Sequence, residues 1–427
     1  MLNDPRSHGL WETTAPAAPE MRALAGAVQA DVVIVGGGFT GLSSALHLAE
    51  GGMKPVVLEA VDVGFGASGR NTGYVNAGLW VMPSDMPGTL GEVHGERMLQ
   101  LLGNSPSVVW NIIDKYRIEC EATRNGTLHC GFGASGMREL EERERQWSRR
   151  GAPVKLLDKA ETSRRIGTDI YSGSLFDKRA GTIQPLAYVR GLARAAMGMG
   201  ARVYNNSRVV GVEEVNGKWT VRTASGSVTA DWVIVATDAY TVSPWSGIRA
   251  EQMHLPYFNI ATRPLSDNLG KIILPNLEGC WDTRKVMTSI RRDARGRLVV
   301  GSIGALRGTG LQVHREWARR ALRKIFPQLG DIAFEAEWYG LIGMTENHLP
   351  RFHKLARNMV GICGYNGRGI APGTVFGGVL ARYILGQLTE ADFPLPVSET
   401  VPAHWRGLRE AYYETGAQLA HFVGARV

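Results

Sequence analysis

The chain has 427 residues, of which 44% are hydrophobic and 21% are charged. This length and composition predict a large core and two domains, and they exclude both a small binding module and a wholly disordered chain. The net charge of +8 is mild and includes no block of Lys and Arg, which argues against a nucleic-acid-binding surface.

The N-terminal residues lack the apolar core of a signal peptide, and no run of about 18 apolar residues occurs. We therefore expect a cytoplasmic protein with at most peripheral membrane contact. The four cysteines form no Cys-x-x-Cys pair, which suits a reducing compartment, and no metal-ligand motif is present, so we expect no metal.

Residues 1–30 show no clear periodicity of apolar residues, which predicts an extended arm. The run 31–35 is apolar and β-branched, which indicates a buried parallel strand. Residues 42–50 place apolar side chains on one helical face, and 55–59 form a second strand. Together these segments predict a strand–turn–helix–strand unit at the front of the fold.

Further along, the patterns predict helices at 105–117, 137–149, 185–199 and 375–385. They predict strands at 208–213, 218–222, 232–236, 297–301 and 359–363, with a type I′ turn at Asn216-Gly217. The expected class is α/β with mixed α+β character: a Rossmann-like nucleotide-binding domain and a second domain on a mixed or antiparallel sheet. We assign 31–80, 151–247 and 341–390 to the first domain, 81–150 and 248–340 to the second, and 391–427 to a C-terminal tail.

The first chemical motif is Gly36-Gly-Gly-Phe-Thr-Gly41, which follows a predicted strand and opens a predicted helix. Gly36 allows a tight turn, Gly38 lets the backbone approach a pyrophosphate, and Gly41 lets helix and strand pack closely. Glu59 ends the next strand, where a carboxylate accepts hydrogen bonds from ribose hydroxyls and repels a 2′-phosphate. The context therefore indicates a dinucleotide site that disfavours an NADP-type ligand.

Three further segments are small-residue or glycine-rich. They are Gly64-Phe-Gly-Ala-Ser-Gly-Arg-Asn-Thr-Gly73, Trp232-Val-Ile-Val-Ala-Thr-Asp-Ala-Tyr240 and Gly364-Tyr-Asn-Gly-Arg-Gly-Ile-Ala-Pro-Gly373. Each lets a ligand approach the backbone, and the last precedes a helix whose N-terminus would stabilise negative charge. Taken alone, each is also compatible with an ordinary turn or core strand.

Together the four motifs resemble the D-amino-acid oxidase superfamily of flavin-dependent oxidoreductases, in the glycine and sarcosine oxidase branch, over residues 31 to about 385. Within it they look most like L-pipecolate oxidase and γ-glutamylputrescine oxidoreductase. The resemblance implies FAD, a two-domain fold, and oxidation of a C–N bond by hydride transfer to flavin N5, with oxygen or a quinone chain as electron acceptor.

The resemblance implies that each motif binds one part of the cofactor: the pyrophosphate, the ribose, the adenine or the flavin. The residues expected to bind FAD are Gly36, Gly38, Phe39, Thr40, Gly41, Glu59, Ala60, Ser68, Arg70, Asn71, Thr72, Gly73, Val209, Ala236, Thr237, Gly364, Asn366, Gly367, Arg368 and Gly369.

Two departures from the sarcosine oxidase pattern matter. No cysteine lies near the loop 344–350, so FAD is expected to be noncovalent. No lysine lies in the loop 368–372, so a substrate carboxylate needs another anchor. We favour Arg291 or Arg292, which precede a Gly-Arg-Leu segment like one in glycine oxidases, although both are also compatible with a surface hairpin.

Two more residues are candidates for the substrate pocket. Tyr257 is a possible aromatic lid and His348 lies in a loop expected near the flavin, although each is at least as compatible with a structural role.

The favoured function is FAD-dependent oxidation of an L-pipecolate-like cyclic or secondary amino acid to an imine. A γ-glutamylputrescine-like amine is the second possibility. An NADPH-dependent flavin hydroxylase and a non-catalytic nucleotide-binding protein remain as weaker alternatives.

Overall fold

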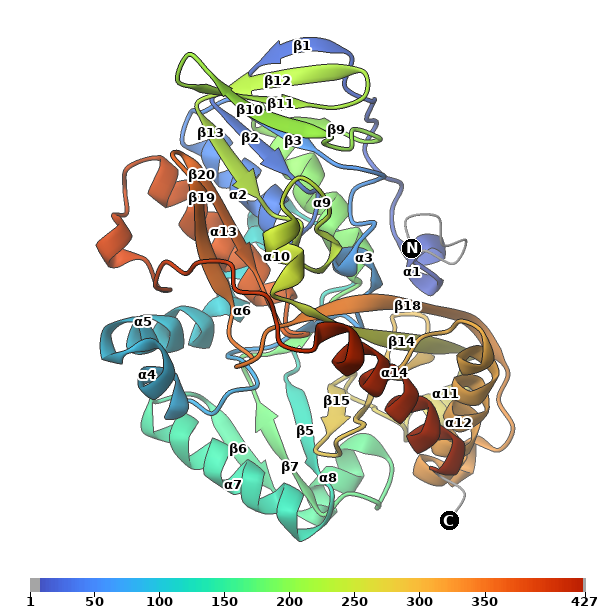
Figure 1. Ribbon diagram of the computed structural model, residues 1–427. Helices are drawn as coiled ribbons and strands as arrows, with labels where there is room; N and C mark the ends of the chain where they lie inside the picture. The colour runs from blue at the N-terminus through green and yellow to red at the C-terminus, as the bar shows by residue number, and fades with distance from the viewer. Residues whose placement is uncertain (1–7, 425–427) are drawn as a thin grey trace.

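The computed structural model describes residues 8–424 and contains three main sheets with their helices (Figure 1). The first has the strand order β19-β20-β13-β2-β3-β9. Its strands are β2 (Val32–Val35), β3 (Pro55–Leu58), β9 (Arg202–Tyr204), β13 (Trp232–Val235), β19 (Arg351–Ala356) and β20 (Met359–Cys363). All neighbours pair in parallel except β19, which is antiparallel to β20.

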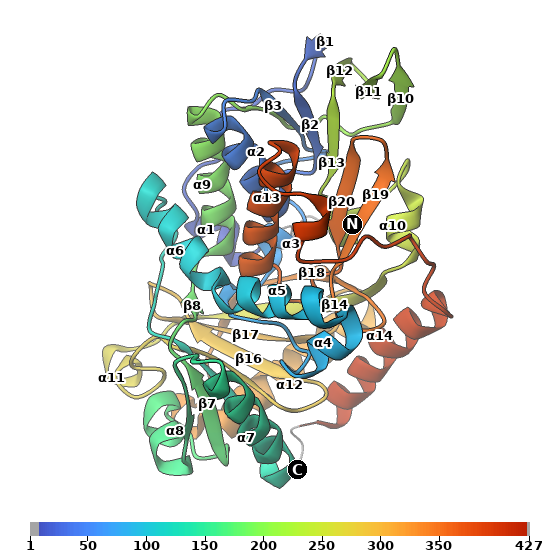
Figure 2. The same ribbon diagram turned by 90° about the vertical axis from the view of Figure 1, so that its left-hand side faces the viewer.

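Alternating side chains of this sheet enter two different cores. Val32 and Ile34 pack with the helices α2 (Phe39–Glu50), α9 (Pro185–Gly198) and α13 (Ile370–Ile384), which cover one face (Figure 2). Val33 and Val35 pack on the opposite face, against a second sheet of order β1-β12-β11-β10. Its strands are β1 (Gly26–Gln29), β10 (Gly211–Val215), β11 (Lys218–Arg222) and β12 (Gly226–Ala230).

The third sheet has eight strands, in the order β18-β14-β17-β16-β15-β5-β7-β6. They are β5 (Thr127–Gly131), β6 (Val154–Leu157), β7 (Gly173–Asp177), β14 (Met253–Pro264), β15 (Gly279–Asp282), β16 (Thr288–Arg292), β17 (Arg297–Ile303) and β18 (Phe334–Met344). Phe258 of β14 is buried on the side of α12 (Thr309–Ile325), whereas its neighbour Tyr257 faces the large cavity described below. A small ribbon of β4 (Tyr74–Val75) and β8 (Gly181–Thr182) lies beside this sheet.

The remaining helices connect or cover these sheets. They are α1 (Leu10–Thr14), α3 (Ala67–Arg70), α4 (Asp85–Leu90), α5 (Glu92–Gly103), α6 (Ser105–Tyr116), α7 (Gly133–Arg149), α8 (Lys159–Ile166), α10 (Ser246–Ala250), α11 (Asp267–Gly270) and α14 (Arg406–Val423). None of the helices in residues 8–424 combines the length and apolar composition needed to cross a membrane.

The predicted fold class is confirmed, and so are the front strand–turn–helix–strand unit and the hairpin, whose turn residues Asn216 and Gly217 both have positive φ. Two predicted boundaries differ from the structure. Strands β6 and β7 lie within 151–247 but pair with β5 in the eight-stranded sheet, and β18 carries residues 341–344 into the same sheet. Sequence alternation identifies a strand but not its partner, which decides the sheet.

The N-terminal arm is not wholly extended. Residues 10–14 form α1, whose Trp11 is fully buried and donates a hydrogen bond to the Asn71 carbonyl. Residues 26–29 form β1, which pairs in parallel with β12. Residues 1–7 of the predicted arm, and 425–427 of the predicted tail, lie outside the described part of the chain.

Candidate functional site

A cavity of about 1210 Å³ lies between the first and the eight-stranded sheet. It is lined by the turn after β2, by α3, by the segment after β13, by strands of the large sheet and by the loop before α13. Small-molecule pockets commonly measure about 300–1,000 Å³, so the cavity has room for a dinucleotide together with a small substrate.

Eighteen of the twenty residues expected to bind the cofactor line this cavity; Gly41 and Gly364 are the two that do not. Both glycines contribute to the backbone behind the lining. A Cβ atom on Gly41 would lie 2.0 Å from the Gly36 carbonyl oxygen, and one on Gly364 would lie 2.4 Å from the Thr345 side chain. Their individual contacts with FAD remain predictions.

The glycine turn has the tight geometry that the motif predicts. Gly36 has φ +109°, and a Cβ there would lie 2.7 Å from the Ala236 carbonyl oxygen on the neighbouring strand. A Cβ on Gly38 would meet the Ser68 hydroxyl at 2.8 Å. Because only glycine fits, the backbone at the N-terminus of α2 is open to a phosphate-bearing ligand.

Glu59 lies at the end of β3 beside this turn. Its carboxylate accepts hydrogen bonds from the Gly37 N–H at 2.8 Å and the Val61 N–H at 3.0 Å. Burial raises the pKa of Glu59, although these backbone donors oppose the shift. The carboxylate is therefore fixed by the backbone while it faces the cavity, as an acceptor for ribose hydroxyls must.

The segment around α3 forms the next part of the wall. The Ser68 hydroxyl accepts a hydrogen bond from the Phe39 N–H at 3.1 Å, which ties α3 to the start of α2. Arg70 is buried beside the Phe65 ring and donates to the Phe65 carbonyl at 2.8 Å. The Thr72 hydroxyl donates to the Asn259 side chain on β14, so this segment joins the two domains.

Asp238 lies in the cavity wall and was not identified from the sequence as a site residue. Its carboxylate accepts a hydrogen bond from the Gly364 N–H at 2.7 Å, which links the segment after β13 to the loop before α13. Burial is the main cause that raises the pKa of Asp238 to about 6. Its position in the sequence, directly after Ala236 and Thr237 at the end of the strand, could have identified Asp238 as a site residue.

The C-terminal loop is held by its own polar groups. Asn366, in a left-handed conformation, accepts a hydrogen bond from the Thr345 N–H at 2.9 Å. His348 lines the cavity with φ +57°, and burial lowers the pKa of its imidazole. The structure therefore brings His348 to the cavity, and its role toward the substrate stays a prediction.

An aromatic wall faces the loop and was also missed from sequence. The His129 ring stacks on Trp281 with centroids 5.2 Å apart, and Trp80 meets both rings edge-on. Trp80 also donates a hydrogen bond to the Asn366 carbonyl at 2.8 Å. The three residues come from three separate segments, so no local motif marks them.

Arg368 extends against this wall. Its guanidinium carbon lies 4.3 Å from the Trp80 ring centre and 5.7 Å from that of Trp281. One terminal nitrogen donates to the Ala77 carbonyl at 3.1 Å, whereas Nε has no hydrogen-bond partner. Within residues 8–424 no carboxylate is paired with it, and burial lowers its pKa to about 9, so the side chain is a cation in need of an anion.

Tyr257 and Tyr74 form another part of the lining. The Tyr257 hydroxyl lies 2.7 Å from the Ser289 hydroxyl, and the Tyr74 hydroxyl donates to the Cys280 carbonyl at 3.0 Å. Tyr257 thus lies in the cavity, as predicted, but its ring belongs to a central strand of the sheet. It acts as a wall and not as a movable lid.

The structure does not bring Arg291 to the cavity. Its guanidinium is fully buried and donates to the carbonyl oxygens of Thr72, at 3.2 Å, and of Ile183. Thr72 and Gly73 line the cavity and lie between it and Arg291. Burial lowers the Arg291 pKa, and the carbonyls satisfy part of its charge, so its place corrects our expectation of a substrate anchor.

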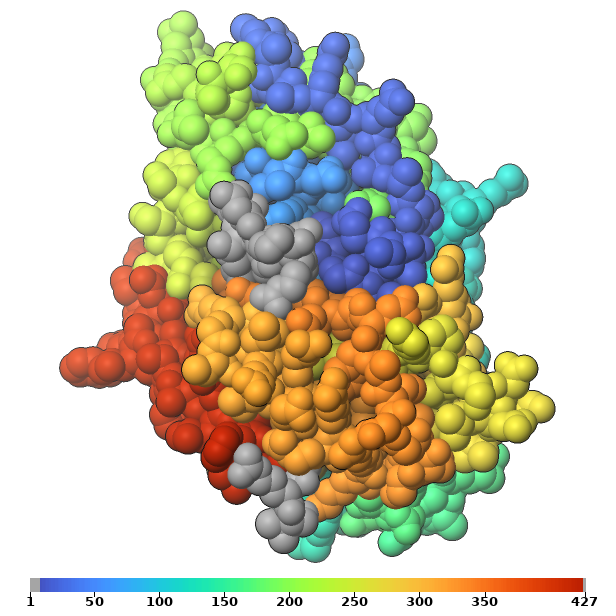
Figure 3. Space-filling model, turned by 90° about the vertical axis from the view of Figure 1, so that its right-hand side faces the viewer, coloured from blue at the N-terminus to red at the C-terminus, as the bar shows by residue number. Residues whose placement is uncertain are grey.

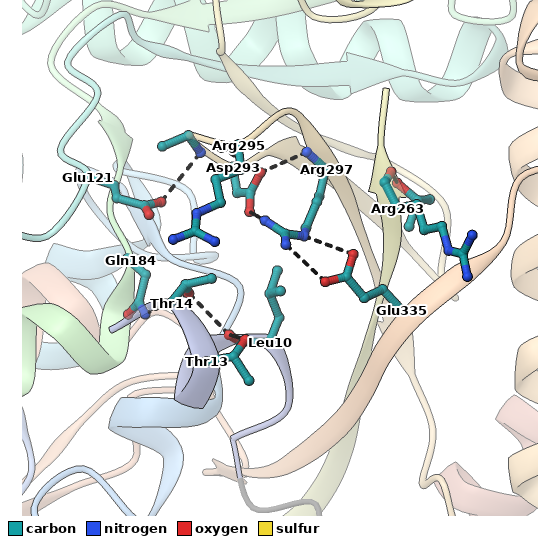
Figure 4. A network of polar contacts seen from close by, with 12 residues as sticks. Leu10, Thr13, Thr14, Glu121, Gln184, Arg263, Asp293, Arg295, Arg297 and Glu335 are labelled. Atoms are coloured by element: carbon teal, nitrogen blue, oxygen red, sulfur yellow. Dashed lines mark hydrogen bonds and ion pairs between the residues drawn. The ribbon is translucent and has the colours of Figure 1, made fainter. Parts of the chain in front are cut away.

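Three other arginines, Arg263, Arg292 and Arg297, also lie outside the cavity lining. Arg292 donates to the carbonyls of Gly270 and Ile273. Arg297 bridges Asp293 and Glu335 with ion-pair distances of 3.2 and 2.9 Å, and Arg263 lies beside this network (Figure 4). These contacts stabilise the turn after β16.

Among the described residues, Glu251, His353 and Cys363 form one buried cluster whose atoms are of the kind that bind metals. His353 Nε2 lies 2.5 Å from the Glu251 carboxylate, which also contacts the Cys363 sulfur at 3.1 Å. None of the three lines the cavity. Their spacing in the sequence did not indicate that these three residues lie together. In the structure they hydrogen-bond to one another.

Comparison with known proteins agrees with this geometry. Residues 31–383 match the family model described as FAD dependent oxidoreductase. The chain is 33% identical to gamma-glutamylputrescine oxidoreductase of Escherichia coli, over 92% of this chain and 94% of that protein. It is also 33% identical to the "Probable oxidoreductase OrdL" of Haemophilus influenzae, over 84% and 83%. Glycine oxidase from Geobacillus kaustophilus has the same fold, with a TM-score of 0.72 at 19% identity over 88% of this chain and all of that one.

Proposed function

Because this chain belongs to the family of FAD-dependent oxidoreductases, we propose that it oxidises a C–N bond in an amino acid or amine that carries a carboxylate, giving an imine. FAD supplies the two-electron oxidation when it is bound. The glycine turn, Glu59 and the α3 segment are the residues that would hold it, since they present an open backbone and a carboxylate acceptor to the cavity.

One observation carries the substrate proposal: the partly buried Arg368 guanidinium packs against Trp80 and Trp281. Its Nε is buried without a hydrogen-bond partner, and no acidic side chain in residues 8–424 pairs with it. A buried cation is costly unless an anion pairs with it. A substrate carboxylate would supply that anion, and guanidinium geometry suits it. The same positive charge disfavours a protonated amine nearby, and oxidation of the C–N bond requires the neutral amine.

Two classes of amine substrate carry a carboxylate that could pair with Arg368. In a cyclic or secondary amino acid such as L-pipecolate the carboxylate is on the carbon next to the nitrogen. In γ-glutamylputrescine it is far from the terminal amine. The similarity to the Escherichia coli protein supports the second class, although identity of 33% leaves the substrate to experiment.

An anaerobic substrate panel tests the proposal. Cyclic amino acids, N-methyl amino acids, γ-glutamylputrescine and putrescine are each mixed with the purified protein, and bleaching of the flavin absorbance is followed. We expect bleaching by carboxylate-bearing amines and little by putrescine. Bleaching by NADPH alone, with none by any amine, would support a hydroxylase instead.

Arg368→Met tests the anchor. Loss of the cation should raise KM for the best carboxylate substrate at least tenfold, since charged hydrogen-bonded pairs contribute about 2–5 kcal/mol. FAD content and the visible spectrum should stay unchanged.

Arg291→Met is the matched control, because it removes another buried arginine that does not reach the cavity. We expect it to lower the melting temperature and to affect carboxylate and non-carboxylate amines equally. If Arg368→Met instead loses FAD, the residue serves the cofactor and the anchor assignment fails.

A further inference from the structure

The C-terminal helix α14 exposes an apolar face to solvent. Six large side chains at or along this 18-residue helix are more than half exposed. They are Trp405 (76%), Leu408 (66%), Tyr412 (74%), Leu419 (62%), Phe422 (52%) and Val423 (62%), here called the α14 apolar face. At 100° per residue they fall within a stripe about 100° wide, along about 27 Å of helix.

The opposite side of α14 is polar and is attached to the protein. Glu410 pairs with Arg249 at 2.9 Å, and Glu414 pairs with Arg307 at 2.5 Å. Near the C-terminal end, the buried His421 ring stacks on Trp317 of α12 at 4.0 Å between centroids. These contacts fix the rotation of the helix, so its apolar face cannot turn inward without breaking them.

This arrangement reverses the usual one. A surface helix normally buries its apolar stripe, and a large continuous exposed patch marks an interaction site. Burial of one such side chain contributes about 1.5–3 kcal/mol, so a partner that covers several of them would bind strongly.

The charge beside the face indicates the kind of partner. Helix α12 packs along α14, and the two lie side by side on one face of the molecule (Figure 3, orange and red). Five of the residues in α12 are Lys or Arg and one is Glu. Three of the five pair with acids, Arg315 with Glu337, Arg319 with Glu316 and Arg323 with Asp331, so five basic groups against three acidic ones leave a net positive charge along this helix. The two acids of α14 point toward the protein and are paired there, so the outward surface is apolar and bordered by positive charge.

We propose that the α14 apolar face docks the protein on an anionic membrane surface. An amphipathic helix with Trp, Phe and Leu on one side and nearby basic residues lies in the membrane interface, with its apolar side chains among the acyl chains. Trp405 and Tyr412 are residue types that favour this interface. The basic side chains of α12 would meet acidic headgroups.

Vesicle co-sedimentation of the FAD-loaded full chain tests this proposal. The probes are vesicles of phosphatidylcholine with 40% phosphatidylglycerol, and vesicles of phosphatidylcholine alone. We expect at least tenfold stronger partitioning to the anionic vesicles, with a decrease as salt increases. Leu408→Glu/Leu419→Glu should weaken this partitioning at least tenfold. Arg319→Glu/Arg323→Glu should weaken it while the apolar face stays intact.

Val93→Glu/Val215→Glu is the matched control, since it places the same charges at exposed apolar positions away from α14. It should bind vesicles as the unmodified protein does. All variants are checked for an unchanged melting temperature and unchanged amine oxidation, because none of the substituted side chains lines the cavity.

Two results would overturn the proposal. One is absence of binding, or equal binding to both kinds of vesicle. The other is a dimer without vesicles, seen by light scattering, that Leu408→Glu/Leu419→Glu dissociates, because the face would then be covered by a second copy of the chain.

Discussion

At the scale of single residues, burial sets the chemistry of the cavity. Glu59 and Asp238 are both carboxylates held by backbone N–H groups, and burial raises both pKa values. Arg368 is a cation whose pKa burial lowers. Burial of each charged group costs free energy while no ligand is bound, so binding of the cofactor and the substrate should offset part of this cost.

Asp238→Asn should change how stability depends on pH. With a folded pKa of about 6 against 3.8 in the unfolded chain, the native carboxyl holds more protons between these values, so the free energy of unfolding falls as pH rises from 4 to 6. Above pH 6 the loss in the free energy of unfolding that is due to Asp238 is constant, at up to about 3 kcal/mol. Asparagine should remove this fall, because its amide does not titrate in this pH range. Its side-chain oxygen can still accept the hydrogen bond from the Gly364 N–H, which keeps the local structure.

Urea unfolding of flavin-free protein between pH 4.5 and 7.5 measures how the free energy of unfolding depends on pH in Asp238→Asn and in the unmodified protein. Asp231→Asn, at an exposed surface ion pair with Lys218, controls for the same change outside the cavity. Parallel pH curves for Asp238→Asn and the unmodified protein would show that Asp238 is not the group responsible.

At the scale of elements, the turn between β2 and α2 depends on close backbone approach. The Gly36 carbonyl oxygen lies where a side chain at position 41 would begin, so helix and strand cannot keep their spacing with any larger residue there. The same elements carry the N–H groups that would face the pyrophosphate.

Gly41→Ala should therefore weaken FAD binding at least tenfold, or prevent folding, because its Cβ would lie 2.0 Å from that oxygen. Gly198→Ala in α9 is the control: no heavy atom lies within 4 Å of the added Cβ, and alanine favours a helix by about 0.5–1 kcal/mol. Flavin content after purification and melting temperature distinguish the two. Normal FAD affinity in Gly41→Ala would contradict the close-packing argument.

At the scale of the whole molecule, the cofactor region is assembled from segments far apart in sequence, and no cysteine reaches it. All four cysteines are buried and free, and none lines the cavity. The fold thus offers no cysteine thiol to a bound flavin.

Acid precipitation of the purified yellow protein should consequently release FAD into the supernatant. Absorbance of the supernatant and of the redissolved pellet near 450 nm gives the two fractions. Flavin that remains in the pellet would show covalent attachment through a different side chain, for which His348 in the cavity wall would be the first to examine.

The sequence by itself determined the features whose cause is local. The glycine turn, Glu59, the β-branched strand 31–35 and the Asn216-Gly217 hairpin follow from backbone sterics and from side-chain period, which act over a few residues. For that reason these elements form where they were predicted. Eighteen of the residues that the family resemblance assigned to the cofactor line one cavity, and their contacts with FAD stay predictions.

Only the tertiary structure decided which polar side chains reach the cavity. Ser289 and Arg291 are on the same face of β16, yet the Thr72-Gly73 segment covers the arginine and leaves the serine in the lining. Trp80 and Trp281 meet Arg368 from separate segments, and His129 from a third segment stacks on Trp281. Helix α14 turns its apolar face outward because its acids pair inward. Strand partners, covering loops and long-range ion pairs set these outcomes, and none of them is encoded in neighbouring residues.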